Sequence, residues 1–147
     1  MATFGSERAR DEAILVARIL LIVLFLVFGW GKLTDYSTTA AYMPRTGAPM
    51  PSVAALVAIV VEVPVALAVA LGVWTRPLTL LLALYTLGTA LIGHPFWTME
   101  GAARYANAIN FYKNVSIIGG FLLLYVTGAG RYSVDASLGR SDAPPPR

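Results

Sequence analysis

Four long apolar runs are the sequence feature that most constrains this chain. They lie near residues 13–33, 52–73, 77–93 and 106–129. Each run approaches or exceeds the roughly 20 helical residues that cross a hydrocarbon core of about 30 Å. In the helix predicted over the first run, leucine, isoleucine and valine occupy every face, as expected where the surrounding solvent is lipid. The sequence therefore predicts an all-α membrane protein, a bundle of four transmembrane helices embedded in the lipid bilayer.

The composition agrees with this class and excludes several functions. Of the 147 residues, 57% are hydrophobic and 13% are charged, unlike an ordinary soluble domain. Cysteine is absent, which excludes disulfides, iron–sulfur clusters and thiolate metal sites for the chain acting alone. The formal net charge is +3, but the basic residues are spread over helix ends and short loops. That distribution indicates membrane topology and predicts no nucleic-acid partner.

The basic residues also predict the orientation of the bundle, because Lys and Arg near helix ends favour the cytoplasm. The first apolar run lacks a small-x-small cleavage site, so we expect it to remain as an anchor. The turn at 74–76 is short, and it predicts an antiparallel hairpin of the second and third helices. Both termini and this turn then share one side, and both termini are predicted to be cytoplasmic. That side carries Arg8, Arg10, Arg18, Arg76, Arg131, Arg140 and Arg147, and the other carries Lys32, Arg45, Arg104 and Lys113.

Three regions follow from this topology. They are a cytoplasmic amino-terminal segment at 1–12, a membrane domain at 13–132, and a cytoplasmic tail at 133–147. The tail ends in prolines and lacks apolar groups, so it is predicted to be disordered. The two outer loops contain aromatic and methionine side chains, and we expect them to lie at the membrane interface or to cover the bundle as a lid. Trp97 is an expected interface anchor.

Glu62 is the strongest single signal, because a carboxylate near the bilayer centre costs at least about 2.5 kcal/mol unless it is paired, protonated or hydrated. Steps of four residues through it meet only alanines, at 54, 58, 66 and 70. Such a ridge allows another helix to approach closely, so Glu62 is predicted to face protein. Two interpretations stay open: an ion pair or hydrogen bond that fixes helix register, and a role in proton transfer or ligand binding.

A polar stripe runs along the first half of the fourth helix. Asn107, Asn110 and Asn114 follow spacings of three and four, which place them on one face, and Lys113 lies at its edge. At 1.5 Å per residue, Lys113 is about 10 Å from the outer end of the helix. The stripe is predicted to face the interior of the bundle.

Lys32 and His94 are predicted to lie in the same outer half of the membrane as Glu62 and Lys113, so these groups could converge. The alternative for both lysines is snorkelling to the interface. His94 is the only histidine and has no second ligand at a metal-binding spacing, so no metal site is predicted. Its alternative is an interfacial side chain without function. Arg18 lies about two turns into the first helix, and we expect it to snorkel to the cytoplasmic surface or to bind an anionic headgroup.

Four short motifs together resemble one family. They are GWGKL at 29–33, Glu62 followed by LGVWTR at 71–76, HPFW at 94–97, and FYKNVSIIGG at 111–120. In this order they resemble the DoxX family of small bacterial inner-membrane proteins, over about residues 13–132. The resemblance implies a multi-pass protein of the bacterial cytoplasmic membrane that is linked to oxidoreductase systems, since some members are subunits of a thiosulfate:quinone oxidoreductase. By position it nominates Arg18, Lys32, Glu62, His94, Lys113 and Asn114.

We therefore expect a membrane subunit of a redox system, without catalysis of its own, whose polar pocket opens to the outer half of the bilayer. A quinone head group is the expected ligand, and the redox chemistry would belong to the quinone or to a partner subunit. Glu62 and His94 would handle protons. The expected ligand-binding side chains are Lys32, Trp97, Asn110, Lys113 and Asn114. The alternatives are a non-enzymatic membrane scaffold, in which the polar core holds the bundle or a homo-oligomer together, and a small oligomeric permease.

Overall fold

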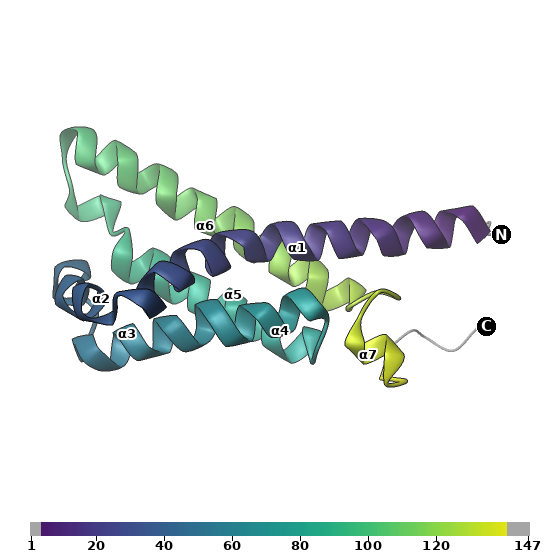
Figure 1. Cartoon of the computed structure of the whole chain (residues 1–147). Coiled ribbons are helices and arrows are strands. Elements are labelled where there is room, and N and C mark those ends of the chain that lie inside the picture. Colours follow the sequence, from purple (N-terminus) through teal and green to yellow (C-terminus); the bar gives the residue numbers. More distant parts are fainter. Residues whose placement is uncertain (1–3, 141–147) are drawn as a thin grey trace.

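The computed structural model describes residues 4–140 and confirms the predicted four-helix architecture (Figure 1). Four spans are long and apolar enough to cross a membrane: Ser6–Thr34, Pro51–Leu71, Thr75–Thr98 and Gly101–Thr127. The described residues contain helices and turns and no strand. The start of α1 and the short helix α7 lie at one end of the bundle, which we call the terminal end, and α2 lies at the other, the distal end (Figure 1).

The elements follow one another along the chain without a long loop. The helices are α1 (Phe4–Thr34), α2 (Tyr36–Tyr42), α3 (Pro51–Val60), α4 (Ala66–Leu71), α5 (Thr75–Gly93), α6 (Gly101–Thr127) and α7 (Val134–Ser137). Three short segments join them. Two are 3₁₀ turns, η1 (Met43–Thr46) and η3 (Phe96–Thr98), and one is a π-helical turn, η2 (Val61–Val65). Helices α1 and α6 both begin earlier than predicted, because their polar first turns continue the helix beyond the apolar run. Asp35 caps α2, and hydrogen bonding to Thr38 lowers the pKa of its carboxyl group.

The second span changes its helical pitch near the middle. Helices α3 and α4 are joined by η2, a π-helical turn that contains Glu62 and Pro64. Proline has no N–H to donate, and its ring collides with the carbonyl four residues earlier in an α-helix. The wider π turn accommodates it, and the Ala66 N–H bonds to the Val61 carbonyl five residues back. Such turns occur often at functional sites.

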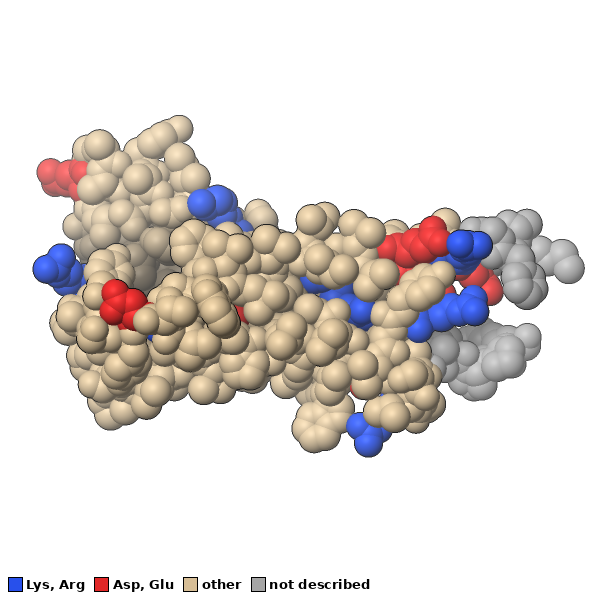
Figure 2. All heavy atoms as spheres, viewed as in Figure 1, with Lys and Arg blue, Asp and Glu red and all other residues tan. Residues whose placement is uncertain are grey.

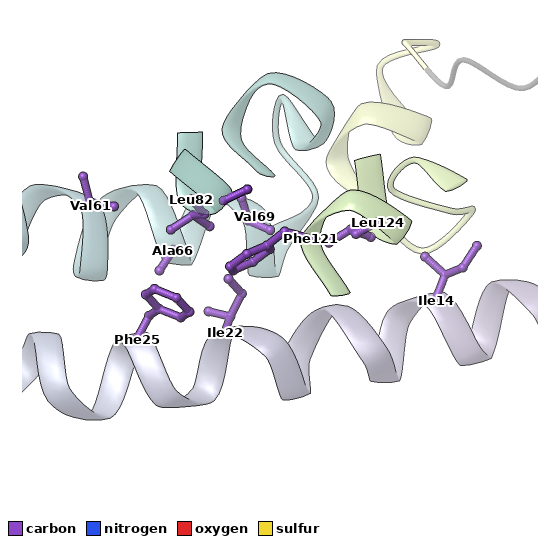
Figure 3. Packing of buried hydrophobic residues seen from close by; sticks show 10 residues of the cluster. Ile14, Ile22, Phe25, Val61, Ala66, Val69, Leu82, Phe121 and Leu124 are labelled. Atoms are coloured by element: carbon purple, nitrogen blue, oxygen red, sulfur yellow. The ribbon is translucent and has the colours of Figure 1, made fainter. Parts of the chain in front are cut away.

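The apolar core lies where α1, α4, α5 and α6 meet (Figure 3). Ile22, Val69, Leu82 and Phe121 are completely buried there. The rings of Phe25 and Phe121 lie 5.5 Å apart and join α1 to α6. Beyond this contact α6 stays packed along α5 but diverges from α1 toward the distal end (Figure 1). The bundle is therefore closed at its centre and open between α1 and α6 at its distal end.

The segment after α6 folds back onto the turn between α4 and α5. The Asp135 carboxylate accepts hydrogen bonds from the backbone N–H groups of Trp74 and Thr75, both at 3.0 Å, and caps the start of α5. Its own N–H donates to the Gly72 carbonyl at 2.9 Å. The predicted disorder is therefore wrong for residues 133–140, because Asp135 is buried in this contact; residues 141–147 lie outside the described chain.

Arg18 is only 1% exposed, so the expectation that it snorkels or binds a headgroup is wrong. Its guanidinium donates to the carbonyls of Ala70 at 3.1 Å, Ala129 at 2.5 Å and Tyr132 at 2.6 Å. The Ala70 carbonyl lies in the last turn of α4, where helical acceptors lack intrahelical donors and the helix dipole is negative. The Ala129 and Tyr132 carbonyls lie in the segment that follows α6. Arg18 therefore fastens α1 to the end of α4 and to this segment.

Candidate functional site

The candidate site is an ion pair inside the bundle. The Lys32 Nζ, from α1, lies 2.5 Å from the Glu62 Oε2, and the Tyr85 hydroxyl, from α5, donates to the Glu62 Oε1 at 2.6 Å. Glu62 is buried at 7% exposure, which confirms that it faces protein. The Lys32 side chain is 26% exposed. Each carboxylate oxygen thus has a donor from a different helix, and Lys32 connects this cluster to the surface.

Gly29 explains why Lys32 can reach Glu62. A Cβ at position 29 would lie 2.7 Å from the Glu62 Cβ and 2.9 Å from its carbonyl carbon. The backbone of α1 therefore touches the π turn directly, and Lys32, one helical turn later, projects from the same side of α1. Ala58 and Ala66 are buried on the same ridge as Glu62, at 4% and 0% exposure. The GWGKL motif and the alanine ridge together build the ion pair.

The opposite charges of Lys32 and Glu62 compensate each other inside the bundle. An unpaired charge in the membrane interior is costly, and a close ammonium and carboxylate offset that cost only when their remaining polar groups are also satisfied. Tyr85 supplies the second hydrogen bond to Glu62. The result is a compact group with several exchangeable protons inside an otherwise apolar bundle.

His94 forms a separate contact where α5 ends. Its Nδ1 lies 2.9 Å from the Asn107 Oδ1, while the Asn107 Nδ2 donates to the Ala103 carbonyl. Because Asn107 offers its oxygen, the Nδ1 carries the hydrogen, and in neutral His94 the Nε2 keeps an acceptor lone pair. Asn107 therefore fixes the ring at the distal end of the bundle.

Four aromatic rings hold the η3 turn on α6. Phe96 and Trp97 contact Phe111 and Tyr112, with centroid distances between 5.4 and 5.9 Å. Edge-to-face packing of this kind stabilises such clusters beyond their buried area. The HPFW and FYKN motifs thus fasten the loop to the first half of α6, and Trp97 is still half exposed, at 51%.

The predicted convergence is only partly present. Lys32 and Glu62 meet, whereas His94 bonds to Asn107. Lys113 is exposed on α6, and Asn110 and Asn114 are half buried. Within the described chain, the side chains of these three residues have no hydrogen bond or ion pair. No group of three His, Asp or Glu residues in the range 4–140 could hold a metal ion.

Asn114 on α6 and Lys32 on α1 lie at comparable positions along the length of the bundle. Lys32 follows Phe25 by seven residues on α1, and Asn114 precedes Phe121 by seven residues on the antiparallel α6. At 1.5 Å per residue, both lie about 10 Å from the contact between the two phenylalanine rings, toward the distal end. Figure 2 shows a hollow in this half of the molecule, where α1 and α6 diverge. Lys32 and Asn114 are therefore at similar depth on helices that diverge.

Sequence reasoning did not nominate Tyr85, Pro64, Gly29 or Asp135. A hydroxyl within an apolar span and a proline two residues after a membrane carboxylate are signals that could have indicated the first two. Asp135 lay in a segment predicted to be disordered, and the role of Gly29 depends on an approach between helices that spacing alone does not determine.

Fold and site define a four-helix membrane protein with an ion pair in its interior, and the chain belongs to the DoxX family, whose model matches residues 13–95. It is 51% identical to inner membrane protein YphA of Escherichia coli strain K12 over 132 residues, 90% of this chain and 94% of that protein. Inner membrane protein YqjF of the same strain is 40% identical over 137 residues, covering 91% and 98%. The predicted family and inner-membrane location are confirmed. No solved structure matches the chain.

Proposed function

We propose that this protein is a membrane subunit that binds a lipophilic carbonyl compound, with a quinone head group as the preferred ligand, beside Lys32 and Glu62. The observation that carries the proposal is the buried ion pair whose lysine side chain is partly exposed. A structural ion pair needs no exposed member, whereas a ligand site does. The hollow between α1 and α6 provides the approach (Figure 2).

The donor set suits a carbonyl ligand. The Lys32 ammonium has three N–H groups and uses one on Glu62, so others can donate to a carbonyl oxygen. Asn114 would add an amide donor at similar depth, and Asn110 would add another about 6 Å nearer the distal end, both from the half-buried face of α6. A quinone would supply the two-electron redox chemistry when bound, and a partner subunit would supply the electrons.

Protons would reach such a ligand through residues of this chain. Tyr85, Glu62 and Lys32 form a hydrogen-bonded series within the bundle. His94, held by Asn107 at the distal end, would exchange protons with water there. In this proposal Glu62 and His94 both handle protons, each in its own cluster.

The test is ligand identification followed by a matched pair of variants. The protein is purified in mild detergent, its lipophilic contents are identified by mass spectrometry, and thermal unfolding is measured with and without a short-chain benzoquinone. We expect a bound quinone and a higher unfolding temperature. Tyr85→Phe should reduce the quinone-dependent rise, whereas Tyr112→Phe, at an exposed tyrosine of α6, should not. A preparation without quinone and without a quinone-dependent shift would refute the proposal.

A scaffold function is the second candidate, because both Glu62 oxygens are already bonded inside the bundle. On that account the cluster sets the register of α1, η2 and α5, as polar groups between membrane helices often do. Glu62→Gln would then lower stability or assembly equally with and without quinone. A loss confined to the quinone-dependent part of the stability would instead favour the ligand site.

A further inference from the structure

We propose that a groove between α1 and α6, whose lining does not include Glu62, binds one acyl chain of an anionic phospholipid from the surrounding bilayer. The groove has a volume of about 670 Å³ and is lined almost entirely by apolar side chains. Its size lies in the range of about 300–1,000 Å³ that is typical of ligand sites. It belongs to neither the ion pair nor the His94 contact.

The shape of the groove follows from small residues on facing helices. Ala13 and Ala17 of α1 and Gly120 of α6 leave room between larger neighbours. A Cβ at Gly120 would lie 2.7 Å from a methyl group of Leu21, so the two helices approach closely along the floor. The ring contact of Phe25 with Phe121 joins the helices at the inner end of the groove.

The length of the groove fits one lipid chain. On α1 its lining runs from Arg10 to Leu24, which is about 21 Å at 1.5 Å per residue. One leaflet with its headgroup region is about 20–22 Å thick, half of the 40–45 Å of a bilayer.

The charge at the terminal end of the groove selects the headgroup. Arg10 lines this end together with Thr127. The neighbouring Arg8 is paired with Glu12 at 2.9 Å, whereas the Arg10 side chain has no hydrogen bond or ion pair within residues 4–140. The Asp11 carboxylate accepts from the Arg131 N–H. A headgroup with net negative charge complements this guanidinium, whereas in a zwitterionic headgroup a cationic amine offsets the phosphate.

Native mass spectrometry of the full chain tests this site. With phosphatidylglycerol or phosphatidylcholine added to the detergent-solubilised protein, we expect one retained phosphatidylglycerol, bound about fivefold more tightly than phosphatidylcholine. Arg10→Gln should remove the difference between the two lipids. Ala17→Phe should fill the groove and reduce the retention of both. Arg104→Gln and Ala106→Phe, exposed substitutions near the start of α6, are the matched controls and should change neither.

Three results would overturn the proposal. They are equal retention of the two lipids by the unaltered chain, retention that survives Ala17→Phe, and a dimer without bound lipid that Ala17→Phe dissociates. The last outcome would mean that a second copy covers the groove. None of these results bears on quinone binding, so this test and the test of the proposed function succeed or fail separately.

Discussion

Exchanging Gly29 for alanine isolates the contact on which the ion pair depends. The added methyl group would lie 2.7 Å from the Glu62 Cβ and 2.9 Å from backbone atoms of the π turn. Reaching an ordinary contact of 3.4 Å requires a shift of about 0.7 Å, and the atoms in the way are a Cβ and two backbone atoms rather than a flexible side-chain end. Overpacking of this kind costs about 1–3 kcal/mol. The shift would also lengthen the contact between Lys32 and Glu62.

Gly31 provides the control two residues away on the same helix, because nothing lies within 4 Å of a Cβ built there. Gly31→Ala should stabilise the helix by about 0.5–1 kcal/mol, since alanine loses less conformational entropy than glycine. The two variants should therefore differ by about 1.5–4 kcal/mol. At about 3 °C per kcal/mol, the expected difference in unfolding temperature is about 5–12 °C. Circular dichroism in one detergent measures it, and a Gly29→Ala variant as stable as Gly31→Ala would refute the packing argument.

Three further predictions concern the polar contacts. Lys32→Met leaves Glu62 buried without its cation and should cost about 3–5 kcal/mol in denaturant unfolding; the double variant with Glu62→Gln should recover most of this, and no recovery would mean that the two charges are uncoupled. Asp135→Ala removes the cap of α5, which should lower the free energy of unfolding by about 0.5–2 kcal/mol, and should speed proteolysis after α6. An unchanged digestion pattern would contradict the contact between this segment and the turn before α5. Arg18→Met leaves three carbonyls without their donor, and each unsatisfied carbonyl costs about 1–3 kcal/mol. The variant should therefore fail to accumulate in membranes. A stable, monodisperse product would show that the carbonyls find other donors.

The spans were predictable from sequence because lipid imposes one rule on every residue around a helix. Burial of Glu62 was predictable for a related reason, since its four-residue neighbours are all alanines. Sequence placed Lys32 among several groups that could converge on Glu62 but did not single it out, because pairing with Lys32 depends on how closely α1 approaches η2. That approach is set by one glycine and by a π turn formed at Pro64.

Arg18 shows why hydropathy alone gave the wrong environment for a charged side chain. In a single helix an arginine near the interface does best by extending toward water. In the bundle, carbonyls from the end of α4 and from the segment after α6 converge on it, 52 to 114 residues away in the chain. The same limitation applies to the tail: its composition resembles a disordered segment, but one carboxylate accepts from the N–H groups at the start of α5, which have no acceptor within that helix.

The cap that Asp135 provides also sets an order of events during synthesis. The carboxylate lies 61 residues after Trp74, whose N–H group it accepts. At about 5–20 residues per second, the ribosome needs roughly 3–12 s to make that stretch. During this interval the first turn of α5 lacks this cap, although α5 itself is complete once Gly93 has been added, 42 residues before Asp135 (135 − 93). The hairpin of the second and third spans therefore reaches its final form only after the fourth span has been made, so a nascent chain truncated before Asp135 stops short of the closed bundle.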